Sequence, residues 1–407
     1  MEKMELLSPA GDMEAIKASF LYGADAVYVG GEGFGLRANA VFGAQELATA
    51  AEYAHRLNKK IYLTCNVVAN NSDIDAFTEF IRNIAALKPM VDAVIVSDLG
   101  IFDLVKKNTD LPIHISTQAG VMNYATANML HGLGAKRIIL ARETTLSDIK
   151  KIRLNTSREL EIEAFVHGAM CMAFSGRCLI STYLANRDAN RGQCAQPCRW
   201  KYYLMEETRP GEFFKVDEDC DGTYIFNSMD LSMLEHIAEL AQSGVSTFKI
   251  EGRAKTAYYS AVITNAYRVA IDSYIKGEVV PEWVKREVNC VSHRPYCTGF
   301  YLGESRENLQ SCENSGYIRD CDFVGVVEKH CEGNLVEITQ RNYFTTQDFL
   351  EVISPGKPPV KLDIEYMKNS KDEIVTVANH AVEVLYVKCD NVDFSVGSMI
   401  RRVNHSL

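Results

Sequence analysis

The sequence lacks any long hydrophobic run. No stretch approaches the roughly 18 consecutive apolar residues that a membrane-spanning helix needs. Glu2, Lys3 and Glu5 stand where a secretory signal peptide would begin its apolar segment. We therefore expect a cytoplasmic protein that makes no contact with a membrane.

An excess of positive charge is also missing. Lysine and arginine number 43 against 53 aspartates and glutamates, which gives a net charge of −10. A protein that coats nucleic acid through bulk charge needs the opposite balance, so binding of nucleic acid would require a local basic site. The hydrophobic fraction of 47% is typical of globular proteins and excludes a disordered, collagen-like or coiled-coil chain.

Three familiar catalytic motifs are absent. The chain contains no G-x-S-x-G, no H-E-x-x-H and no G-x-x-x-x-G-K-[ST], the marks of serine hydrolases, zinc peptidases and P-loop enzymes. The glycine-rich stretch 30–35 follows an apolar run, as a phosphate-binding loop does. Leu36 stands where the last glycine of G-x-G-x-x-G belongs, so this stretch is a weak indication.

The first 275 residues contain a regular alternation of short apolar runs and amphipathic stretches. Between the runs, apolar residues recur at spacings of three and four, which predicts helices. Eight strand–helix units predict an α/β fold, a (β/α)8 barrel of the TIM type, because a doubly wound open sheet usually has about five to seven strands. The predicted strands are residues 5–8, 26–30, 60–66, 92–97, 112–117, 136–141, 160–166 and 245–250.

One unit of the predicted barrel domain, residues 1–276, is abnormally long. About 60 extra residues, 167–229, separate strand seven from its helix, and loops in this position lie on the active face of such barrels. Residues 277–320 have little periodicity and are predicted to form a connecting arm. Residues 321–403 alternate apolar and polar side chains between glycine, proline and asparagine breaks, which predicts a small antiparallel β-barrel.

The insertion holds an unusual group of cysteines. Four of the twelve cysteines fall within 28 residues, and a reducing cytoplasm favours a metal or redox role over disulfides. Zinc sites usually combine two close pairs, whereas iron–sulfur clusters accept wider spacings, so we favour a 4Fe-4S cluster over zinc or ordinary thiols. The four cysteines are Cys171, Cys178, Cys194 and Cys198, and Cys220 is the reserve for the fourth ligand.

Basic residues surround these cysteines. Between residues 168 and 204 five basic residues face one acid, Asp188, a local charge of +4 in an acidic chain. Arginines there could stabilise an anionic cluster or hold the phosphates of nucleic acid. The arginines that we expect to bind substrate from this segment are Arg187, Arg191 and Arg199.

A ring of polar residues follows the predicted barrel strands, where such barrels place their catalytic groups. Arg142, Lys249 and Arg253 together predict an anionic substrate, since arginine binds carboxylates and phosphates through two hydrogen bonds. His167 could donate a proton or hydrogen-bond the insertion. We predict His167, Lys249, Glu251 and Arg253 as catalytic residues, and Asn66, Gln118 and Arg142 as further substrate-binding residues.

Several longer motifs are familiar as a set. They are LSPAGD at 7–12, YGADAVYVG at 22–30, STQ at 116–118, FVHGAMCMAFSGRC at 165–178, KIEGR at 249–253 and TGFYLG at 298–303. Together they resemble the collagenase-like peptidase family U, number thirty-two, across the barrel and into the arm. The chain length, RDANRG at 187–192 and CAQPCRW at 194–200 look most like the bacterial group of tRNA hydroxylation proteins of the P type.

That resemblance implies a reaction. It suggests an enzyme that converts wobble uridine of tRNA to 5-hydroxyuridine, with an iron–sulfur cluster and with prephenate as a small anionic partner metabolite. The four-cysteine clusters of relatives match Cys171, Cys178 and Cys194, and their fourth ligand varies.

Two other functions stay open: a collagenase-like peptidase of unknown catalytic type, and a non-catalytic RNA-binding protein with a structural cluster. The C-terminal domain is expected to dock RNA with the help of Arg401 and Arg402, or else to act as a structural cap. The sequence does not predict the oligomeric state.

Overall fold

A computed structural model describes most of the 407 residues. The described residues are 4–35, 41–87, 91–170, 178–200, 203–204, 214–215, 229–303, 318–332, 334–389 and 394–404. Among the helices of these ranges, none combines the length and the apolar character needed to cross a bilayer.

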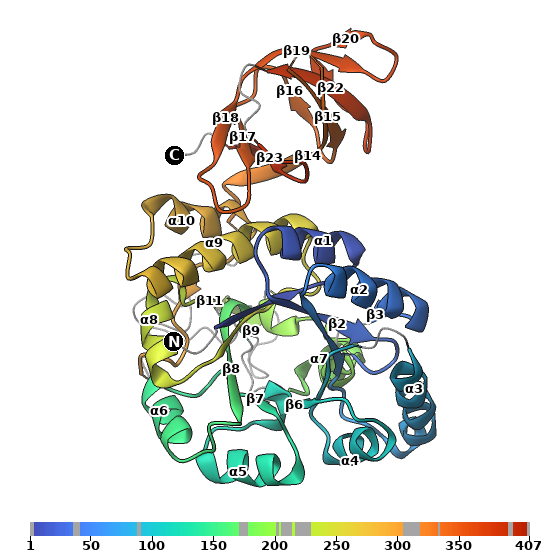
Figure 1. The fold of residues 1–407 in the computed structure, drawn as a ribbon, viewed down its shortest axis with the longest axis vertical. Coiled ribbons are helices and arrows are strands. Elements are labelled where there is room, and N and C mark those ends of the chain that lie inside the picture. Colours follow the sequence, from blue (N-terminus) through green and yellow to red (C-terminus); the bar gives the residue numbers. More distant parts are fainter. Residues whose placement is uncertain are drawn as a thin grey trace.

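Eight parallel strands form a closed ring (Figure 1). Each strand pairs with its neighbour in chain order, and β12 pairs with both β8 and β1, which closes the barrel. The predicted (β/α)8 barrel is therefore confirmed, and every predicted strand overlaps an observed one. The strands are β1 (Glu5–Pro9), β2 (Ala26–Gly31), β4 (Lys60–Cys65), β5 (Ala93–Val96), β6 (Ile113–Ile115), β7 (Arg137–Ile139), β8 (Glu161–Ala169) and β12 (Thr247–Ile250).

One helix follows each barrel strand and covers the outside of the ring. Side-chain caps set the start of five of these eight helices; Asp98, for example, accepts hydrogen bonds from the backbone N–H groups of Gly100 and Ile101. Gly134 ends its helix with a φ of 118°, a conformation that glycine adopts without strain. These helices are α1 (Met13–Leu21), α2 (Ala44–Arg56), α3 (Ile74–Ala86), α4 (Leu99–Asn108), α5 (Tyr124–Leu133), α6 (Leu146–Leu154), α8 (Ile237–Ser243) and α9 (Ala257–Lys276).

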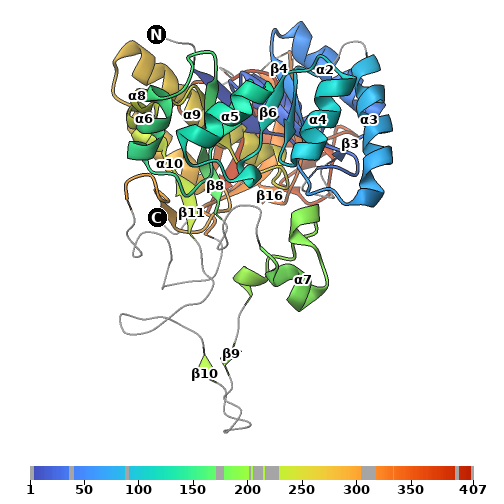
Figure 2. The same cartoon turned by 90° about the horizontal axis from the view of Figure 1, so that it is seen from below.

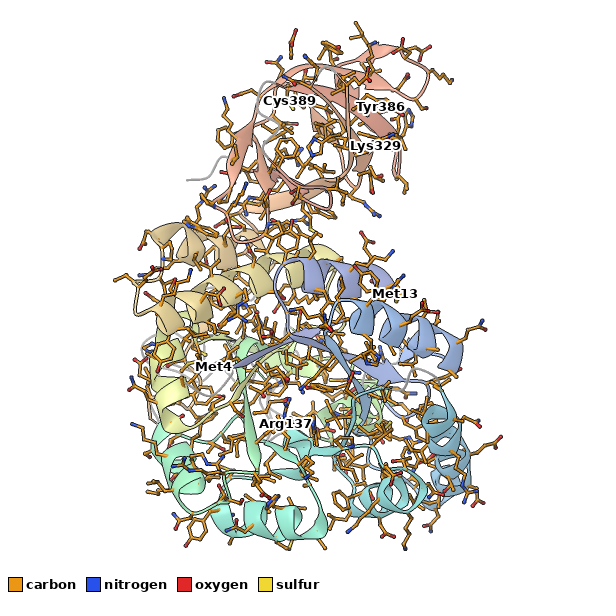
Figure 3. The ribbon with its side chains drawn as sticks, viewed as in Figure 1. Met4, Met13, Arg137, Lys329, Tyr386 and Cys389 are labelled. Carbon is orange, nitrogen blue, oxygen red and sulfur yellow. The ribbon has the colours of Figure 1, made fainter. Side chains whose placement is uncertain are left out.

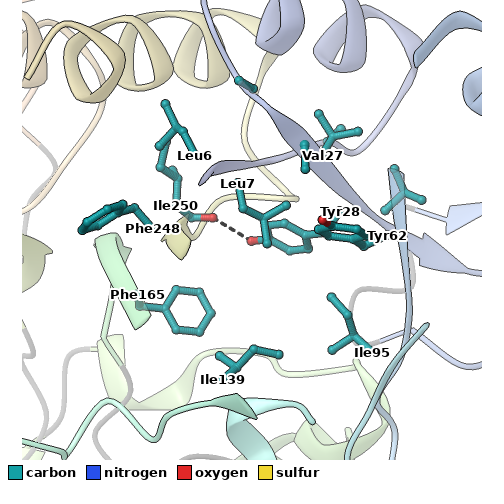
Figure 4. Packing of buried hydrophobic residues seen from close by; sticks show 14 of the residues in the cluster. Leu6, Leu7, Val27, Tyr28, Tyr62, Ile95, Ile139, Phe165, Phe248 and Ile250 are labelled. Carbon is teal, nitrogen blue, oxygen red and sulfur yellow. Dashed lines mark hydrogen bonds between the residues drawn. The ribbon is translucent and has the colours of Figure 1, made fainter. Parts of the chain in front are cut away.

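The barrel strands are buried on both faces, which explains their continuous apolar runs. Figure 4 shows the packing of their side chains, including the hydrogen bond of 2.9 Å from the Tyr28 hydroxyl to the carbonyl of Ile250. This bond joins β2 to β12, through residues that are 222 positions apart in the sequence. The buried polar tip of Tyr28 is thereby satisfied.

The insertion extends beyond the carboxyl end of β8, on the face where the barrel strands end (Figure 2). It contains α7 (Ile180–Ala185) and the small hairpin β9 (Tyr203–Leu204) and β10 (Phe214–Lys215). The chain returns through β11 (Asp230–Ser232), which pairs antiparallel to the end of β8. Because the insertion follows the carboxyl end of β8, it lies on the same face as the loops after the other parallel strands.

The segment that we expected to be an irregular arm contains regular elements. Helix α10 (Glu282–Glu287) starts after Pro281, and β13 (Tyr296–Cys297) adds to the barrel sheet by pairing with β11. Elements of two to six residues are too short to show a period, so the sequence pattern does not reveal them.

The C-terminal part is a curled antiparallel sheet with a small pair beside it. The alternation predicts strands at residues 323–327, 335–339, 349–353, 374–377, 382–387 and 399–403, and each of these overlaps an observed strand. Strands β16, β18 and β19 come in addition, because β16 and β18 have only two and three residues and apolar Tyr366 and Met367 interrupt the alternation in β19. The strands are β14 (Cys321–Cys331), β15 (Leu335–Gln340), β16 (Phe344–Thr345), β17 (Leu350–Ile353), β18 (Val360–Leu362), β19 (Ile364–Asn369), β20 (Ile374–Val375), β21 (Val377–Ala378), β22 (Val384–Cys389) and β23 (Met399–Val403).

Buried polar contacts fasten this sheet to the barrel helices. The hydroxyl of Tyr22, the residue after α1, donates to the carbonyl of Ile353 at 2.8 Å and accepts from the N–H of Met399 at 3.1 Å. Such contacts tie the two parts together through groups that water does not reach.

Arg401 is fully buried and pairs with Glu287 of α10 and Glu351 of β17, at 2.7 and 2.6 Å. The expectation that Arg401 offers positive charge to RNA is therefore wrong. Its partners lie 114 and 50 residues away in the sequence, beyond the reach of a local pattern.

Candidate functional site at the barrel mouth

The carboxyl ends of the strands carry a group of polar residues, which we call the mouth group: Asn66, Gln118, Arg142, Glu251 and Arg253. Its best-defined contact joins Arg142, just after β7, to Glu251, just after β12, at 3.2 Å. Arg142 also donates to the carbonyl of Ala169 at 3.1 Å and lies 4.0 Å from the centre of the Phe165 ring. The structure thus brings together two of the predicted residues as an ion pair.

Backbone contacts hold Glu251 in place. Its N–H donates to the carbonyl of His167 at 2.8 Å, and its own carbonyl accepts the Tyr259 hydroxyl at 2.9 Å. The side chains of Arg142 and Glu251 are 10% and 17% exposed, so both can reach a molecule that enters the mouth. An anionic ligand could therefore replace the carboxylate on the guanidinium, and Glu251 could accept a proton.

Arg253 is the second cation of the mouth group. Its guanidinium donates to the hydroxyl of Thr64 at 2.6 Å and lies 5.7 Å from the centre of the Tyr28 ring. The side chain is buried, and burial raises the pKa of the neighbouring thiol of Cys65 despite this positive charge. Cys65 is therefore a neutral packing residue rather than a nucleophile.

Ser116 connects the two uncharged members of the group. The amide of Asn66 donates to the Ser116 hydroxyl at 3.3 Å, and the same hydroxyl accepts the backbone N–H of Gln118 at 3.4 Å. The side-chain oxygen of Gln118 is buried and has no hydrogen-bond partner among the described residues. A buried acceptor without a partner is costly, which makes this oxygen a candidate contact for a ligand.

Lys249 lies deeper in the barrel than we expected. Its ammonium contacts a carboxylate oxygen of Glu163 at 2.8 Å and is 4.3 Å from the centre of the Tyr28 ring. It is 4% exposed, and burial lowers its pKa against the opposing charge of Glu163. Of the three cations predicted to meet an anionic substrate, two lie at the mouth and Lys249 belongs to the interior.

The interior contains what we call the base network: Glu5, Arg137, Glu163 and Lys249. Arg137, seen inside the ring in Figure 3, contacts Glu5 at 2.7 Å and Glu163 at 3.0 Å. Glu5 and Arg137 begin β1 and β7, so the network starts at the amino end of the barrel. At its more exposed edge Glu161 also pairs with Arg137, and Lys60 pairs with Glu5 at 3.4 Å, so three carboxylates and three cations balance one another there, as buried charges require.

His167 lies in a ring of tyrosines. Tyr267 and Tyr296 approach its two ring nitrogens at 3.3 and 3.5 Å, and Tyr259 lies beside the ring. The Tyr267 hydroxyl donates to the carbonyl of Val166, so Nδ1 of His167 must donate to that hydroxyl.

Burial lowers the pKa of His167 to about 3, and the imidazole is therefore neutral near pH 7. A neutral imidazole is a poor proton donor near pH 7, and the described partners of its ring are Tyr267 of α9 and Tyr296 of β13 rather than the insertion that we expected. The backbone of His167 also pairs with Ser232 of β11, the strand by which the chain returns to the barrel.

The basic residues of the insertion play different parts. Arg191 donates two hydrogen bonds to Asp73, at 2.7 and 2.9 Å, and thereby ties the insertion to the segment after β4. These bonds lower the pKa of Asp73 to about 2. Arg187 is exposed, and the side chain of Arg199 lies outside the described residues.

Three of the four cluster cysteines are described, and Cys171 lies outside the described residues, as does Cys220. Cys178 precedes α7, while Cys194 and Cys198 lie on the returning segment, which the Ala195 N–H joins to the Ser181 hydroxyl of α7 at 3.0 Å. The N–H of Gln196 donates to the Cys194 sulfur at 3.3 Å, a contact typical of metal-bound thiolates.

Thiol ligands therefore suit an iron–sulfur cluster, but the described residues do not assemble a complete set of ligands. Within the described ranges, no three His, Cys, Asp or Glu side chains come close enough to hold a metal ion. The ligand set, including the choice between Cys198 and Cys220, stays a prediction.

Sequence reasoning missed the tyrosines around His167. Tyr259 and Tyr267 stand eight residues apart in α9, a spacing that places both on the barrel side of the helix. The spacing of Tyr259 and Tyr267 is visible in the sequence, whereas the approach of Tyr296 from the arm is not.

The fold and the mouth group define a class: a (β/α)8 barrel with polar residues at its mouth and a thiol-bearing insertion, joined to an antiparallel β domain. Residues 11–311 match the family model described as Peptidase family U32, and residues 319–401 match that of the Peptidase family U32 C-terminal domain. The chain belongs to peptidase family U32, as the sequence motifs indicated.

Three curated relatives show how varied the names within this family are. The chain is 35% identical to tRNA hydroxylation protein P of Escherichia coli (strain K12), covering 93% of this chain and 92% of the relative. It is 36% identical to the 23S rRNA 5-hydroxycytidine C2501 synthase of the same organism, over 67% of this chain and 40% of the relative. It is also 32% identical to a collagenase of Porphyromonas gingivalis, with 79% of each chain covered.

Proposed function

We propose that this protein is an enzyme that hydroxylates RNA, and that its substrate is the wobble uridine of tRNA, which becomes 5-hydroxyuridine. One observation carries this proposal: the similarity to tRNA hydroxylation protein P extends over 93% of the chain, through the barrel, the insertion and the C-terminal domain. The rRNA hydroxycytidine synthase among the relatives supports base hydroxylation as the reaction class. The cytoplasm, where tRNA is found, remains the expected location.

The mouth group suits such a substrate. A wobble base belongs to a single-stranded loop, so presenting it to a protein costs less than flipping a paired base. The side-chain oxygen of Gln118 could accept the N3–H of uracil, which would satisfy this buried acceptor. The chain thus offers a specific contact to the base edge.

Arg142 and Arg253 suit an anionic co-substrate. Guanidinium groups bind carboxylates through paired hydrogen bonds, and prephenate carries two carboxylates. The carboxylate of Glu251 already pairs with Arg142, and a carboxylate of the ligand would replace it on the guanidinium. Prephenate or a metabolite derived from it is therefore the co-substrate that we propose for this site.

An iron–sulfur cluster completes the proposal. Cys171, Cys178, Cys194 and either Cys198 or Cys220 would hold a 4Fe-4S cluster, and such a cluster supplies one-electron chemistry when bound. Arg191, which ties the insertion to the barrel through Asp73, positions the segment that carries the thiols. The protein's own contribution is to hold the base, the anion and the insertion on one face of the barrel.

Nucleoside mass spectrometry of tRNA tests the proposal. A strain that lacks this gene and any paralogue should lose 5-hydroxyuridine and its derivatives from tRNA, and the wild-type gene should restore them. Complementation with Arg142→Gln should restore at most about one tenth, because a charged contact of about 1.5–3 kcal/mol is lost. Arg82→Gln is the matched control, since Arg82 is exposed on the outer wall, where it contacts Asn108.

Undiminished hydroxylation in the deletion strain would overturn the proposed reaction. The relative named collagenase gives the peptidase alternative its support, so the pure protein should also be offered gelatin. Cleavage of gelatin by pure wild-type protein, together with unchanged tRNA, would favour the peptidase.

A further inference from the structure

Exposed aromatic side chains gather on one face of the molecule. Among the described residues, four large aromatic side chains are exposed: Tyr124, Tyr183, Trp200 and Tyr343. Three of them lie on the side where the barrel strands end, at the start of α5 and in the insertion around α7 (Figure 2). We call Tyr124, Tyr183 and Trp200 the aromatic face. Single exposed apolar side chains are common, but a group of them beside a substrate site indicates a binding partner.

The opposite end of the barrel has a different surface. There, the described large apolar side chains that are exposed near the ends of the barrel helices are all aliphatic: Leu21, Leu57, Leu133, Leu154 and Ile275. An aliphatic side chain has no π face on which a flat ring can stack, whereas tyrosine and tryptophan have one. The difference between the two ends favours a partner with flat rings on the face of the mouth group.

Tyr124 is connected to the mouth group through the chain. It is the first residue of α5 and stands six positions after Gln118. The segment between them is fixed to the barrel, because the carbonyl of Val121 accepts the N–H of Ala141 at 3.0 Å. The side chain of Asn123 caps the helix at this point. The exposed ring of Tyr124 is therefore held beside the site by an ordered backbone.

Tyr183 is the most exposed residue of the aromatic face, at 82%. Ser181 is buried, and its hydroxyl accepts the N–H of Ala195, so that side of α7 contacts the returning segment. Tyr183 stands two residues later, about 200° further round the helix, and therefore points away from this segment. The ion pair of Arg191 with Asp73 ties the insertion to the barrel, so the exposed ring has a defined place on this face.

Trp200 belongs to the same unit of the insertion. It follows the short helix η4 (Pro197–Arg199), which packs against α7, and its N–H donates to the carbonyl of Pro197 at 3.0 Å. The side chain is 46% exposed, although a tryptophan gains much from burial. Arg187, between Tyr183 and Trp200 in the sequence, is exposed as well and can contact a phosphate.

Unpaired nucleotides suit this surface. Proteins recognise single-stranded RNA largely by stacking its bases on aromatic rings, and every base has a π face. We propose that the aromatic face stacks unpaired bases of the RNA loop that flank the nucleotide presented at the mouth. This inference rests on the proposed function, because it takes RNA as the partner. The rings hold the neighbouring bases, and the target base enters the barrel.

Binding of an anticodon stem–loop RNA, measured by fluorescence anisotropy, tests the inference. Tyr183→Ala and Trp200→Ala should each bind the RNA at least about 5-fold more weakly than wild type, because the stacking of one base is lost. The salt dependence should keep its slope, since neither change removes a cation. Tyr343→Ala is the matched control, because Tyr343 is 48% exposed but lies between β15 and β16 of the C-terminal domain. Unchanged melting temperatures would show that the variants are folded.

Two further variants distinguish stacking from general apolar contact. Tyr183→Phe keeps the ring and should bind like wild type, whereas Tyr183→Leu keeps only the apolar character and should bind as weakly as Tyr183→Ala. A fully paired RNA duplex has no free base faces at its centre, so its binding should be the same in all variants. If Tyr183→Leu binds the stem–loop like wild type, the face accepts any apolar partner, such as a protein segment, and the inference is overturned.

The two proposals fail in different ways. If wild-type protein hydroxylates the RNA while Tyr183→Ala and Trp200→Ala bind it like Tyr343→Ala, the aromatic face has no role in binding and the proposed function stands. If the wild type binds the stem–loop through these rings but the deletion strain keeps its 5-hydroxyuridine, the proposed reaction fails and the stacking of RNA bases stands.

Discussion

The charged side chains at the two ends of the barrel differ in their pairing and in their exposure. In the base network, Arg137 and Lys249 are matched by Glu5 and Glu163, and the side chains are between 0% and 12% exposed. In the mouth group, Arg142 and Glu251 form a partly exposed pair, and the side-chain oxygen of Gln118 is buried without a partner in the described part of the chain. Paired buried charges at one end stabilise the fold, whereas at the other end a partly exposed ion pair and the oxygen of Gln118, which has no partner among the described residues, are available to a ligand.

Removing one charge from the base network should have the largest effect on stability. Arg137→Met removes the cation that contacts both Glu5 and Glu163 and leaves these carboxylates buried. Removing one partner of a buried ion pair costs about 3–5 kcal/mol. We expect the free energy of unfolding in urea to fall by that amount.

A control distinguishes charge from packing in this experiment. Arg137→Met combined with Glu163→Gln removes one charge of each sign and should recover part of the lost stability. A loss below about 1 kcal/mol in the single variant would contradict the role of the network.

The second prediction concerns His167, which lies near the carboxyl end of β8. Its folded pKa of about 3 is below the value of about 6.5 in an unfolded chain. Below pH 6.5 the unfolded state binds a proton that the folded state does not, so stability falls as the pH drops towards 3, by at most about 1.4 kcal/mol per unit. Above pH 6.5 this residue adds no pH dependence.

His167→Asn is the variant that isolates this effect. An asparagine amide can still donate to Tyr267, as Nδ1 of His167 does, but it does not titrate. Between pH 6.5 and 5 the wild type should lose up to about 2 kcal/mol more than the variant. Parallel stability curves would show that His167 is not held neutral by burial.

The smallest expected change in stability is at the mouth. Gln118→Leu removes a buried oxygen that has no partner among the described residues. Because an unsatisfied buried acceptor is costly, the variant should be as stable as wild type or up to about 1 kcal/mol more stable. Thermal unfolding measures this change, and a loss of more than about 2 kcal/mol would show that the residue is structural.

The sequence predicts the barrel well because its signals are local. Buried parallel strands are short continuous apolar runs, and each of the eight recurs with a helix after it. The short elements α10 and β18 are not predicted, because a few residues are too short a stretch to show a hydrophobic period. Prediction succeeds where one element carries its own pattern.

The site is harder to predict because side-chain direction and distant partners decide it. Lys249 stands near the end of a strand, as a mouth residue would, yet its partner Glu163 lies 86 residues earlier and draws it into the interior. Arg191 looks like a phosphate ligand, but Asp73, 118 residues away, binds it. The Arg142–Glu251 pair was predicted residue by residue, although not as a pair.

The variant Gln118→Leu tests the role of the mouth group most directly, because its effect on tRNA hydroxylation can be compared with its effect on stability. A deletion strain complemented with Gln118→Leu should contain at least about tenfold less 5-hydroxyuridine in its tRNA per folded protein than one with the wild-type gene, since a site that hydrogen-bonds its substrate loses strongly when that contact is removed. The purified variant should meanwhile unfold at or above the wild-type temperature. Full hydroxylation by this stable variant would contradict the claim that the side-chain oxygen of Gln118, which has no partner among the described residues, binds the substrate.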